Sequence, residues 1–346
     1  MRSYLMTALS FMSSEQEGNK EFVFTVGQFN ILAKELASPT HFPSVKEENL
    51  HWESRSARIV QNIEDMQTKD GRADLVCVEE LSEYWEFFKD TIVQRLGYNS
   101  VYFKRPSITV SSWSGKIKTD GCGIFYSPEK FRLVHHHSVN FSDTHDRVGL
   151  MLLLRCQGPL EGAGHIVVAN THLYWDISKT DVQLRELKQV QVAIGELLQH
   201  AKVENSLDPA TVPIVFAGDL NNTPSSRIYQ HMLNSFLPEH RMRSSFANYK
   251  KLKTFSGEEL TGTDTSGEYE PEATTVTHRR ARTIDYIFYS SSLLEVSSLQ
   301  PLPSIEELRE ESGDPNWQSK VPELHFDPNT NYNGIPNSKW GSDHIP

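Results

Sequence analysis

Apolar residues recur along the chain with two periods, and each period predicts one kind of secondary structure. Short runs rich in β-branched and aromatic residues predict strands, because such side chains suit the half-buried face of a pleated sheet. We expect strands at residues 22–32, 74–79, 100–104, 123–126, 148–155, 166–171, 214–217 and 284–289. Apolar residues spaced three and four apart predict amphipathic helices at about 52–67, 82–96 and 181–200.

Each predicted helix carries one apolar stripe. The first stripe consists of Ile59, Val60, Ile63 and Met66. In the second helix, Ser82 is a candidate N-cap, and the stripe consists of Trp85, Phe88, Ile92 and Leu96. The third stripe consists of Leu184, Leu187, Val190, Ile194 and Leu197. We interpret all three stripes as core-facing and assign them no chemistry. Two sheets with helices outside them would bury every predicted strand.

The segment PIVFAGDLNNTPSS contains a strand that ends at Ala217 and is followed by two polar residues, Asp219 and Asn221. Alternate side chains of an extended chain point the same way, so these two can address one small target, such as a water and a phosphate oxygen. The ordinary alternative is an Asx turn that closes the strand.

Other polar residues also stand at the borders of strand-like runs. They are Asn30, Glu80, His172, Asp285 and the pair Asp343 and His344. Each one has an ordinary explanation by itself, as a turn residue, a solvated helix start, a packed imidazole or a strand cap. Their shared position at strand borders indicates one common site.

Composition and charge narrow the class of protein. Of the 346 residues, 38% are hydrophobic, which is enough for a real core, and no apolar run is long enough to span a bilayer. The net charge of −11 excludes a broadly basic surface. Local patches remain candidates to bind phosphate, notably Arg279, Arg280 and Arg282. The three cysteines lie in separate apolar runs, which indicates reduced core thiols rather than a zinc site.

The run His135 to His137 lies in a strand-like stretch between Val134 and Val139. Alternation would place the rings on opposite faces of that strand. We therefore do not assign it a metal site.

Seven segments resemble one known group of proteins: QFNILA, DLVCVEEL, DGCGIFYSPEKF, NTHLYWDISKTDVQLRELK, FAGDLNNTPSS, RTIDYIFYS and IPNSKWGSDHIP. They resemble the endonuclease/exonuclease/phosphatase superfamily, and within it the carbon-catabolite-repressor-type deadenylases, nocturnin and the Angel proteins. The resemblance covers about residues 22–346. It implies an α/β (α+β) fold, a four-layered αββα sandwich of two mostly antiparallel mixed sheets flanked by helices.

A phosphodiester repels nucleophiles, so its hydrolysis needs a cation to neutralise charge and a base to form hydroxide. Hard oxygen ligands without a Cys or His cluster point to Mg²⁺ or Mn²⁺. The resemblance implies Glu80 as the metal carboxylate, with Glu79 where a Gln is usual. It also implies that Asn30 supports the metal and the phosphate, and that Asp343 holds a second ion.

The remaining roles concern the reacting groups. Asp219 is the candidate to activate the attacking water, and Asn221 to fix that water or the phosphate. His344 would stabilise the phosphorane, and Asp285 would pair with His344 and favour its protonated form. His172 resembles a second phosphate contact, and its alternative is a hydrogen-bonded core imidazole.

Both ends of the chain carry an expectation. We expect residues 1–20 to be disordered, with a weak resemblance to a targeting leader, and residues 21–346 to form a single catalytic domain. The family continues beyond its SDHIP block into a closing strand, whereas this chain stops at Pro346. We therefore expect a chain that is cut short and lacks its last strand, with His344 on a fraying terminus.

Together these features predict a Mg²⁺-dependent phosphoesterase. Our first expectation is a 3′-to-5′ exoribonuclease that acts on poly(A)-tailed mRNA and releases nucleoside 5′-monophosphates. The alternatives are a nucleotide or dinucleotide phosphatase, a 2′,3′-cyclic phosphatase or 2′-phosphodiesterase, and a non-catalytic RNA-binding relic. Tyr174 stands where nocturnin-type proteins carry a basic residue, which weakens the dinucleotide alternative. We expect a cytoplasmic protein without a leucine-rich-repeat docking module or a membrane span, and leave mitochondrial and nuclear placement open.

Overall fold

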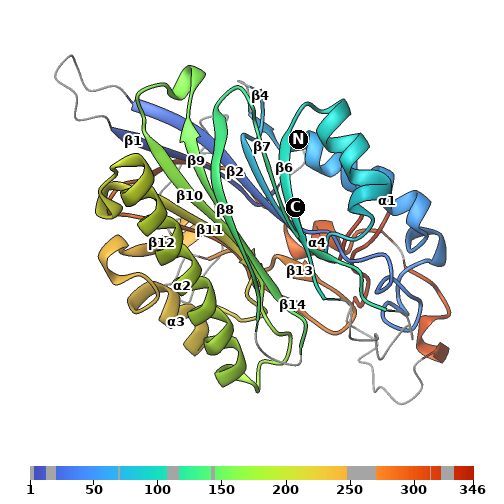
Figure 1. Ribbon diagram of the computed structural model, residues 1–346. Helices are drawn as coiled ribbons and strands as arrows, with labels where there is room; N and C mark the ends of the chain where they lie inside the picture. The colour runs from blue at the N-terminus through green and yellow to red at the C-terminus, as the bar shows by residue number, and fades with distance from the viewer. Residues whose placement is uncertain are drawn as a thin grey trace.

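Two six-stranded sheets face each other, and helices cover their outer sides (Figure 1). This computed structural model describes residues 4–12, 21–68, 71–106, 117–141, 145–247, 270–311, 313–320 and 331–346. The arrangement is the four-layered sandwich that the sequence predicts. Each of the eight predicted strands is present to within two residues at either end.

The first sheet has the strand order β16–β1–β2–β5–β7–β6. Its strands are, in that order, Glu295–Leu299, Met6–Met12, Glu21–Asn30, Leu75–Glu79, Gly121–Tyr126 and Asn99–Lys104. β2 and β5 run parallel, and every other neighbouring pair is antiparallel. Two helices pack on the outer face, α1 at Trp52–Asp65 and the π-helix η2 at Tyr84–Arg95.

The second sheet has the order β12–β15–β11–β10–β9–β8. Its strands are Met242–Ser244, Asp285–Ser290, Ile214–Asp219, His165–His172, Val148–Cys156 and Phe131–Asn140. Here β10 and β11 form the parallel pair. Helices α2 at Thr180–Asn205 and α3 at Arg227–Asn234 cover the outer face.

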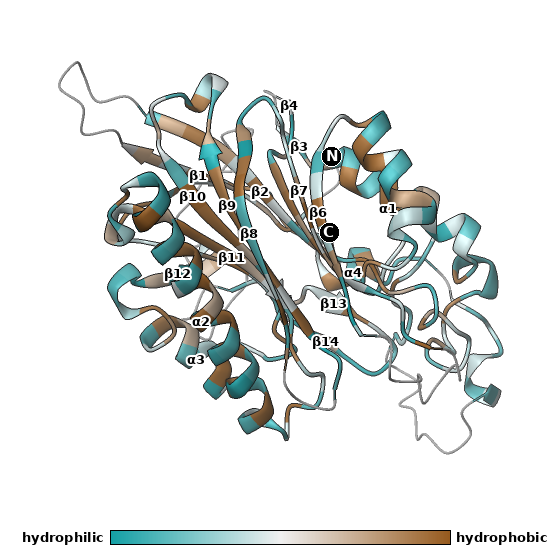
Figure 2. Ribbon diagram, in the orientation of Figure 1, coloured by the Kyte–Doolittle hydropathy of each residue, from teal (hydrophilic) through white to brown (hydrophobic). Residues whose placement is uncertain are grey.

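Strand β9 shows how alternation builds the layers. Leu150, Leu152 and Leu154 point into the core between the sheets, whereas Met151 and Leu153 pack on the side of α2. Both faces of the strand are therefore apolar, as the brown strands at the centre of Figure 2 show. A shift of one residue in the register of β9 would exchange these two sets of side chains between the layers and disrupt the packing on both faces.

Short elements complete the described chain. The strands are β3 at Gln67–Thr68, β4 at Gly71–Arg72, β13 at Thr275–Val276 and β14 at Ala281–Arg282. A helix, α4, spans Ile305–Leu308. Single 3-10 turns lie at Glu47–Asn49, Gly158–Leu160, Pro209–Thr211, Pro238–His240, Ser245–Ala247 and Trp317–Lys320. None of the helices in the described ranges has the length and apolar character needed to cross a membrane.

The expected disorder at the N-terminus is wrong for residues 4–12. β1 lies between β16 and β2 and pairs with both, and Leu5 and Leu9 are fully buried. The alternating apolar side chains of this segment fill the core between the sheets on one side and the helix-covered face on the other. The strand thus belongs to the first sheet.

The expected fraying of His344 is also wrong. His344 forms a bridge with Thr275, and the Ile345 amide donates to the Thr274 carbonyl at 2.7 Å. The Leu5 amide, at the start of the segment that continues into β1, donates to the Pro346 carbonyl. Residues 343–346 are therefore hydrogen-bonded to residues 274–275 on one side and to Leu5 on the other.

The second predicted helix differs from its expected form. Ser82 does not cap it, because its hydroxyl accepts a hydrogen bond from the Lys34 amide at 3.0 Å. The wider turn of a π-helix changes which residues share a face. Trp85, predicted to face the core, is consequently 61% exposed, while its neighbour Tyr84 is buried.

Candidate active site

The two parallel strand pairs end at the same place, and they bring the predicted polar residues together. In the first sheet, Asn30 at the end of β2 lies opposite Glu79 at the end of β5. In the second, His172 ends β10 opposite Asp219 on β11, and Asp219 lies opposite Asp285 of β15. Residues 343 and 344 approach from the other end of the chain.

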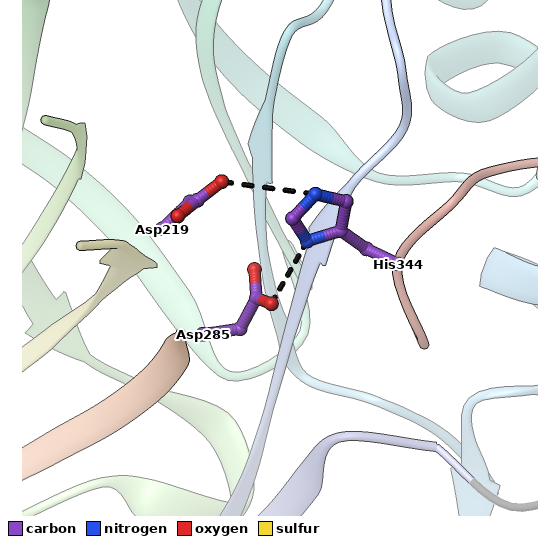
Figure 3. A group of neighbouring side chains, drawn as sticks. All are labelled: Asp219, Asp285 and His344. Atoms are coloured by element: carbon purple, nitrogen blue, oxygen red, sulfur yellow. Dashed lines mark hydrogen bonds and ion pairs between the residues drawn. The ribbon is translucent and has the colours of Figure 1, made fainter. Parts of the chain in front are cut away.

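His344 lies between two aspartates, and its pairing with Asp285 is the one that the sequence predicted (Figure 3). Its Nδ1 is 2.8 Å from Asp285 Oδ2, and its Nε2 is 3.8 Å from Asp219 Oδ2. Asp285 Oδ2 also accepts from the Thr274 hydroxyl at 2.6 Å, and Asp285 Oδ1 accepts from Gln28 Nε2 at 3.1 Å. Asp285 is thereby fixed and directs His344 toward Asp219.

Burial and charge act in opposite directions on these groups. Burial alone would lower the pKa of His344, but Asp285 and then Asp343 outweigh it and raise that pKa to about 10. The pKa of Asp219 is raised by burial and by the charge of Asp285. His344 is thus a cation at neutral pH, and Asp219 is a stronger base than an exposed aspartate.

Asn30 contacts Asp219. Its amide Nδ2 donates to Asp219 Oδ2 at 3.0 Å, and its Oδ1 accepts from the Leu32 amide at 3.0 Å. The other oxygen of Asp219 accepts from the backbone N–H of Asn221 at 2.8 Å. Hydrogen bonds to both of its oxygens fix the orientation of the Asp219 carboxylate. A fixed orientation suits a general base, which must accept a proton from one direction.

His172 is 5% exposed, and a side-chain nitrogen lies beside each of its ring nitrogens, only one of which can accept a hydrogen bond when the ring is neutral. Arg147 Nη1 is 2.9 Å from its Nδ1, and Asn221 Nδ2 is 2.9 Å from its Nε2. Burial, followed by the charge of Arg147, lowers the pKa of His172 well below its usual value. The ring is therefore neutral, and it lines a pocket while also being hydrogen-bonded in the core.

The side chains of the adjacent residues Glu79 and Glu80 point in different directions, the first into the core and the second into the pocket. Glu80 adopts a left-handed backbone conformation with φ of 53° and lines the pocket, where its Oε2 accepts from the Ala33 amide at 2.9 Å. Glu79 is fully buried, and its Oε2 accepts from Gln28 Nε2 at 2.6 Å. Of the two, Glu80 is the one placed to hold an ion.

Charge in the pocket fits a hard divalent cation. Burial, followed by the negative charges of Asp120 and Asp343, raises the pKa of Glu80, so this carboxylate is poorly compensated by the protein. Glu80, Asp219 and Asp343 all line the pocket with carboxylate oxygens, the donors that Mg²⁺ and Mn²⁺ prefer. Within the described ranges, Asp219, Asp285 and His344 also offer ligand atoms within 4.8 Å of one another.

The pocket lined by Glu80, Asp219 and His344 has a volume of about 350 Å³, and another pocket of about 180 Å³ adjoins it. Trp175, Asn221 and Arg280 line both. Arg279 lines the first and Arg282 the second, so all three predicted arginines face the site. Trp175 is 60% exposed and forms a flat apolar wall where the pockets meet.

Sequence reasoning missed several residues of this site. Gln28 lies two positions before Asn30 on the same strand, so strand alternation alone could have indicated it. Arg147 precedes β9, and Thr274 comes from the segment before β13. No spacing connects these two with His172 or Asp285, because they meet only in the folded chain.

One protein family and several known proteins resemble this chain in sequence. A profile of the Endonuclease/Exonuclease/phosphatase family matches residues 27–344. "Carbon catabolite repressor protein 4 homolog 4" of Arabidopsis thaliana is 27% identical over 336 residues, which cover 82% of this chain and 73% of that protein. Nocturnin of Xenopus laevis is 28% identical over 305 residues, covering 86% and 70%. The "CCR4-Not complex 3'-5'-exoribonuclease subunit Ccr4" of Kluyveromyces lactis is 26% identical over 351 residues, covering 93% of this chain but 40% of that protein.

Two solved structures share the fold. That of ANGEL2, a 2′,3′-cyclic phosphatase, superposes with a TM-score of 0.62 at 21% identity, covering 100% of this chain and 96% of that one. The human Nocturnin catalytic domain with bound sulfate gives a TM-score of 0.52 at 24% identity, covering 84% of both chains. At these identities the similarity shows the fold alone.

Proposed function

Because the chain belongs to the Endonuclease/Exonuclease/phosphatase family and is a phosphoesterase of it, we propose that it is a divalent-metal-dependent 3′-to-5′ exoribonuclease. It shortens poly(A) tails and releases nucleoside 5′-monophosphates. One observation carries the proposal: the pocket at Asp219 and His344 continues past an exposed tryptophan into a second, arginine-lined pocket. A strand of nucleotides needs such a continuation, whereas a small phosphate monoester does not.

Glu80, Asn30 and Asp343 are the residues that would hold Mg²⁺ or Mn²⁺. Asp343, carried on the segment that also bears His344, would serve a second ion. A bound divalent cation supplies charge neutralisation and polarises the scissile phosphate. The position of Glu80 in the pocket, with its carboxylate oxygens beside those of Asp219 and Asp343, supports this assignment.

The protein's own groups supply the proton transfers. Asp219 accepts the proton of the attacking water, which Asn221 orients, and the two hydrogen bonds that hold Asp219 fix its direction. His344, protonated and held through Nδ1 by Asp285, donates from Nε2 to a nonbridging oxygen as negative charge develops there. His172 lies beside Asn221 and contacts the same phosphate.

The rim of the site, formed by Trp175, Arg279, Arg280 and Arg282, selects the substrate. A nucleobase stacks on Trp175, since stacking on aromatic rings binds bases with little sequence preference. Arg279, Arg280 and Arg282 contact backbone phosphates. The name of the Kluyveromyces lactis relative, a 3′-5′-exoribonuclease subunit, supports RNA as the partner.

A second candidate function is 2′,3′-cyclic phosphatase activity. It is the activity of ANGEL2, a 2′,3′-cyclic phosphatase, whose fold superposes over nearly the whole of both chains. This reaction removes only a terminal phosphate and leaves the length of the RNA unchanged.

The test uses four substrates: A-tailed RNA, tail-free RNA, RNA ending in a 2′,3′-cyclic phosphate, and NADPH. Each is incubated with Mg²⁺ or with chelator, and Asp219→Asn is the inactive control. We expect stepwise shortening of the A-tailed RNA with release of AMP, only when Mg²⁺ is present. Loss of the cyclic phosphate without shortening would replace the exonuclease by the second candidate.

A further inference from the structure

Arg147 is a buried cation that lines the pocket of Glu80 and Asp219. It directly precedes β9, and its backbone carbonyl accepts a hydrogen bond from the Phe141 amide at 3.1 Å. Only 7% of the residue is exposed, although it lines the pocket. The fold therefore places a buried positive charge at a fixed position in the site.

The charge of Arg147 is not balanced by a carboxylate. Arg105, another buried arginine, forms an ion pair with Asp120. In the part of the chain that the structure describes, Arg147 has no such pair, and its polar side-chain contact is from Nη1 to Nδ1 of His172, at 2.9 Å. Burial, followed by the positive charge of Arg105, lowers the pKa of Arg147. A buried guanidinium costs free energy unless it meets an anion or a good acceptor.

His172 is not an acceptor for Arg147. Nδ2 of Asn221 donates to the Leu173 carbonyl at 3.1 Å, and this bond fixes the amide with its nitrogen 2.9 Å from Nε2 of His172. Nε2 therefore accepts from Asn221, and Nδ1 carries the hydrogen of the neutral ring. In a protonated ring Nδ1 would carry a hydrogen as well. Nη1 of Arg147 thus faces another donor and has no acceptor among the described residues.

The reacting phosphate is an anion within reach of this guanidinium. Nδ1 of His172 lies 2.9 Å from Nη1 of Arg147 and 3.8 Å from Oε1 of Glu80. The guanidinium therefore lies close to the carboxylate that we propose as the metal ligand. A phosphate oxygen accepts from a guanidinium at about 2.7–2.9 Å. Because a phosphate carries oxygens on all sides, one bound beside Glu80 can also accept from Arg147.

We propose that Arg147 is a catalytic residue that donates from Nη1 to a nonbridging oxygen of the reacting phosphate. The inference rests on the proposed function of this pocket as a phosphoesterase site, and it holds for either candidate substrate. Negative charge develops on the nonbridging oxygens in the transition state, and a fixed, buried donor stabilises that charge without having to reorganise. Arg147 therefore adds a second cationic donor to that of His344.

The first test measures phosphate binding without turnover. AMP is titrated by calorimetry, in millimolar Mg²⁺, into the wild type, Arg147→Met and Arg147→Lys. The matched control is Arg155→Met, which removes an exposed arginine near the other end of β9. We expect Arg147→Met to bind AMP at least about tenfold more weakly, the usual effect of one hydrogen bond to a charged group. Arg147→Lys should recover part of the loss, and Arg155→Met should bind like the wild type.

The second test separates direct contact from support of His172. On whichever substrate the wild type turns over, Arg147→Met should lower kcat about 10²- to 10³-fold, the usual effect of removing one donor to a developing charge. The same substitution should lower kcat further in a His172→Ala background. No further loss there would show that Arg147 acts only through His172. Melting curves check folding, and Arg147→Gln replaces Arg147→Met if the latter does not fold.

The outcomes distinguish this inference from the proposed function. Equal AMP affinity and equal kcat in the wild type and Arg147→Met would overturn the inference, as would a loss that disappears in the His172→Ala background. Shortening of A-tailed RNA at the same rate by both proteins would leave the exoribonuclease and remove the role of Arg147. Weaker AMP binding by Arg147→Met, in a protein that leaves A-tailed RNA intact, would support the role of Arg147 and reject the exoribonuclease.

Discussion

Each sheet contains one parallel pair of strands, β2 with β5 in the first and β10 with β11 in the second. The two pairs have the same backbone arrangement but present different side chains to the site. Each pair lies inside its sheet and ends at the pocket. The first delivers Glu80, whose charge the protein leaves poorly compensated. The second delivers His172 and Asp219, which are hydrogen-bonded to their neighbours on several sides. We propose from this difference that the first pair holds a cation and the second transfers protons.

The backbone explains how each pair aims its residue. Glu80 turns into the pocket through a left-handed conformation directly after β5, and Glu79 stays in the core. On β11, Gly218 has a φ of 153° and packs against the Thr171 carbonyl, where a Cβ atom would clash. Glycine thus lets β11 approach β10 closely enough to set Asp219 level with His172.

The largest expected effect is at Glu80. Glu80→Ala should abolish metal-dependent hydrolysis and weaken Mg²⁺ binding, with little change in melting temperature, because the carboxylate binds an ion rather than the core. Activity against A-tailed RNA and Mg²⁺ calorimetry measure the two effects. If Glu80→Ala spares activity while Glu79→Gln removes it, the ligand has been assigned to the wrong acid.

The second-largest effect is expected at Asp219 and His344, the residues that we assign to proton transfer and charge stabilisation. Asp219→Asn and His344→Ala should each lower kcat about 10²- to 10⁴-fold, the usual contribution of general base and electrostatic catalysis. KM should change little, since the rim still binds the RNA. Steady-state kinetics on A-tailed RNA separate the two constants. Parallel losses in kcat and in affinity would instead indicate that these residues maintain the fold.

The Asp285–His344 pair predicts a pH dependence of stability. The folded-state pKa of His344 is about 10 against an ordinary 6.5, so the folded form binds this proton more tightly than the unfolded form. Its contribution is complete below pH 6.5 and is lost as pH rises toward about 10. Urea unfolding between pH 6 and about 10 should show falling stability, and Asp285→Asn should reduce that slope. Identical slopes in both proteins would refute the coupling.

A smaller effect is expected at the rim. Arg280→Glu with Arg282→Glu should weaken binding of A-tailed RNA and flatten its salt dependence, because fewer phosphate contacts release fewer counterions. Cleavage of a dinucleotide should change much less. Fluorescence anisotropy at several salt concentrations measures the slope, and an unaltered slope would remove these arginines from the path of the RNA.

The smallest effect is expected from Glu79→Gln. Burial, followed by the charge of Asp285, raises the pKa of Glu79 well above its usual range, so the side chain is a neutral acid. An amide of the same shape can keep the contact with Gln28. Turnover and melting temperature should stay close to those of the wild type. A large loss of either would mean that Glu79 works as an ionised group.

Much of this site could be predicted because its residues follow strands whose apolar patterns are clear. Asn30, His172 and Asp219 are each the last residue of their strand. The strand β1 was missed because a short apolar run near the start does not reveal its partners, one of which lies at residues 295–299. Arg147 and Thr274 were missed for the same reason, since their contacts join segments distant in sequence.

The division of labour between the two strand pairs is tested most directly by Mg²⁺ calorimetry on the wild type, Glu80→Gln and Asp219→Asn. The account predicts that Glu80→Gln weakens Mg²⁺ binding at least tenfold, whereas Asp219→Asn binds Mg²⁺ nearly as the wild type does although it turns over very slowly. Equal weakening of Mg²⁺ binding in both variants, or weakening only in Asp219→Asn, would contradict it.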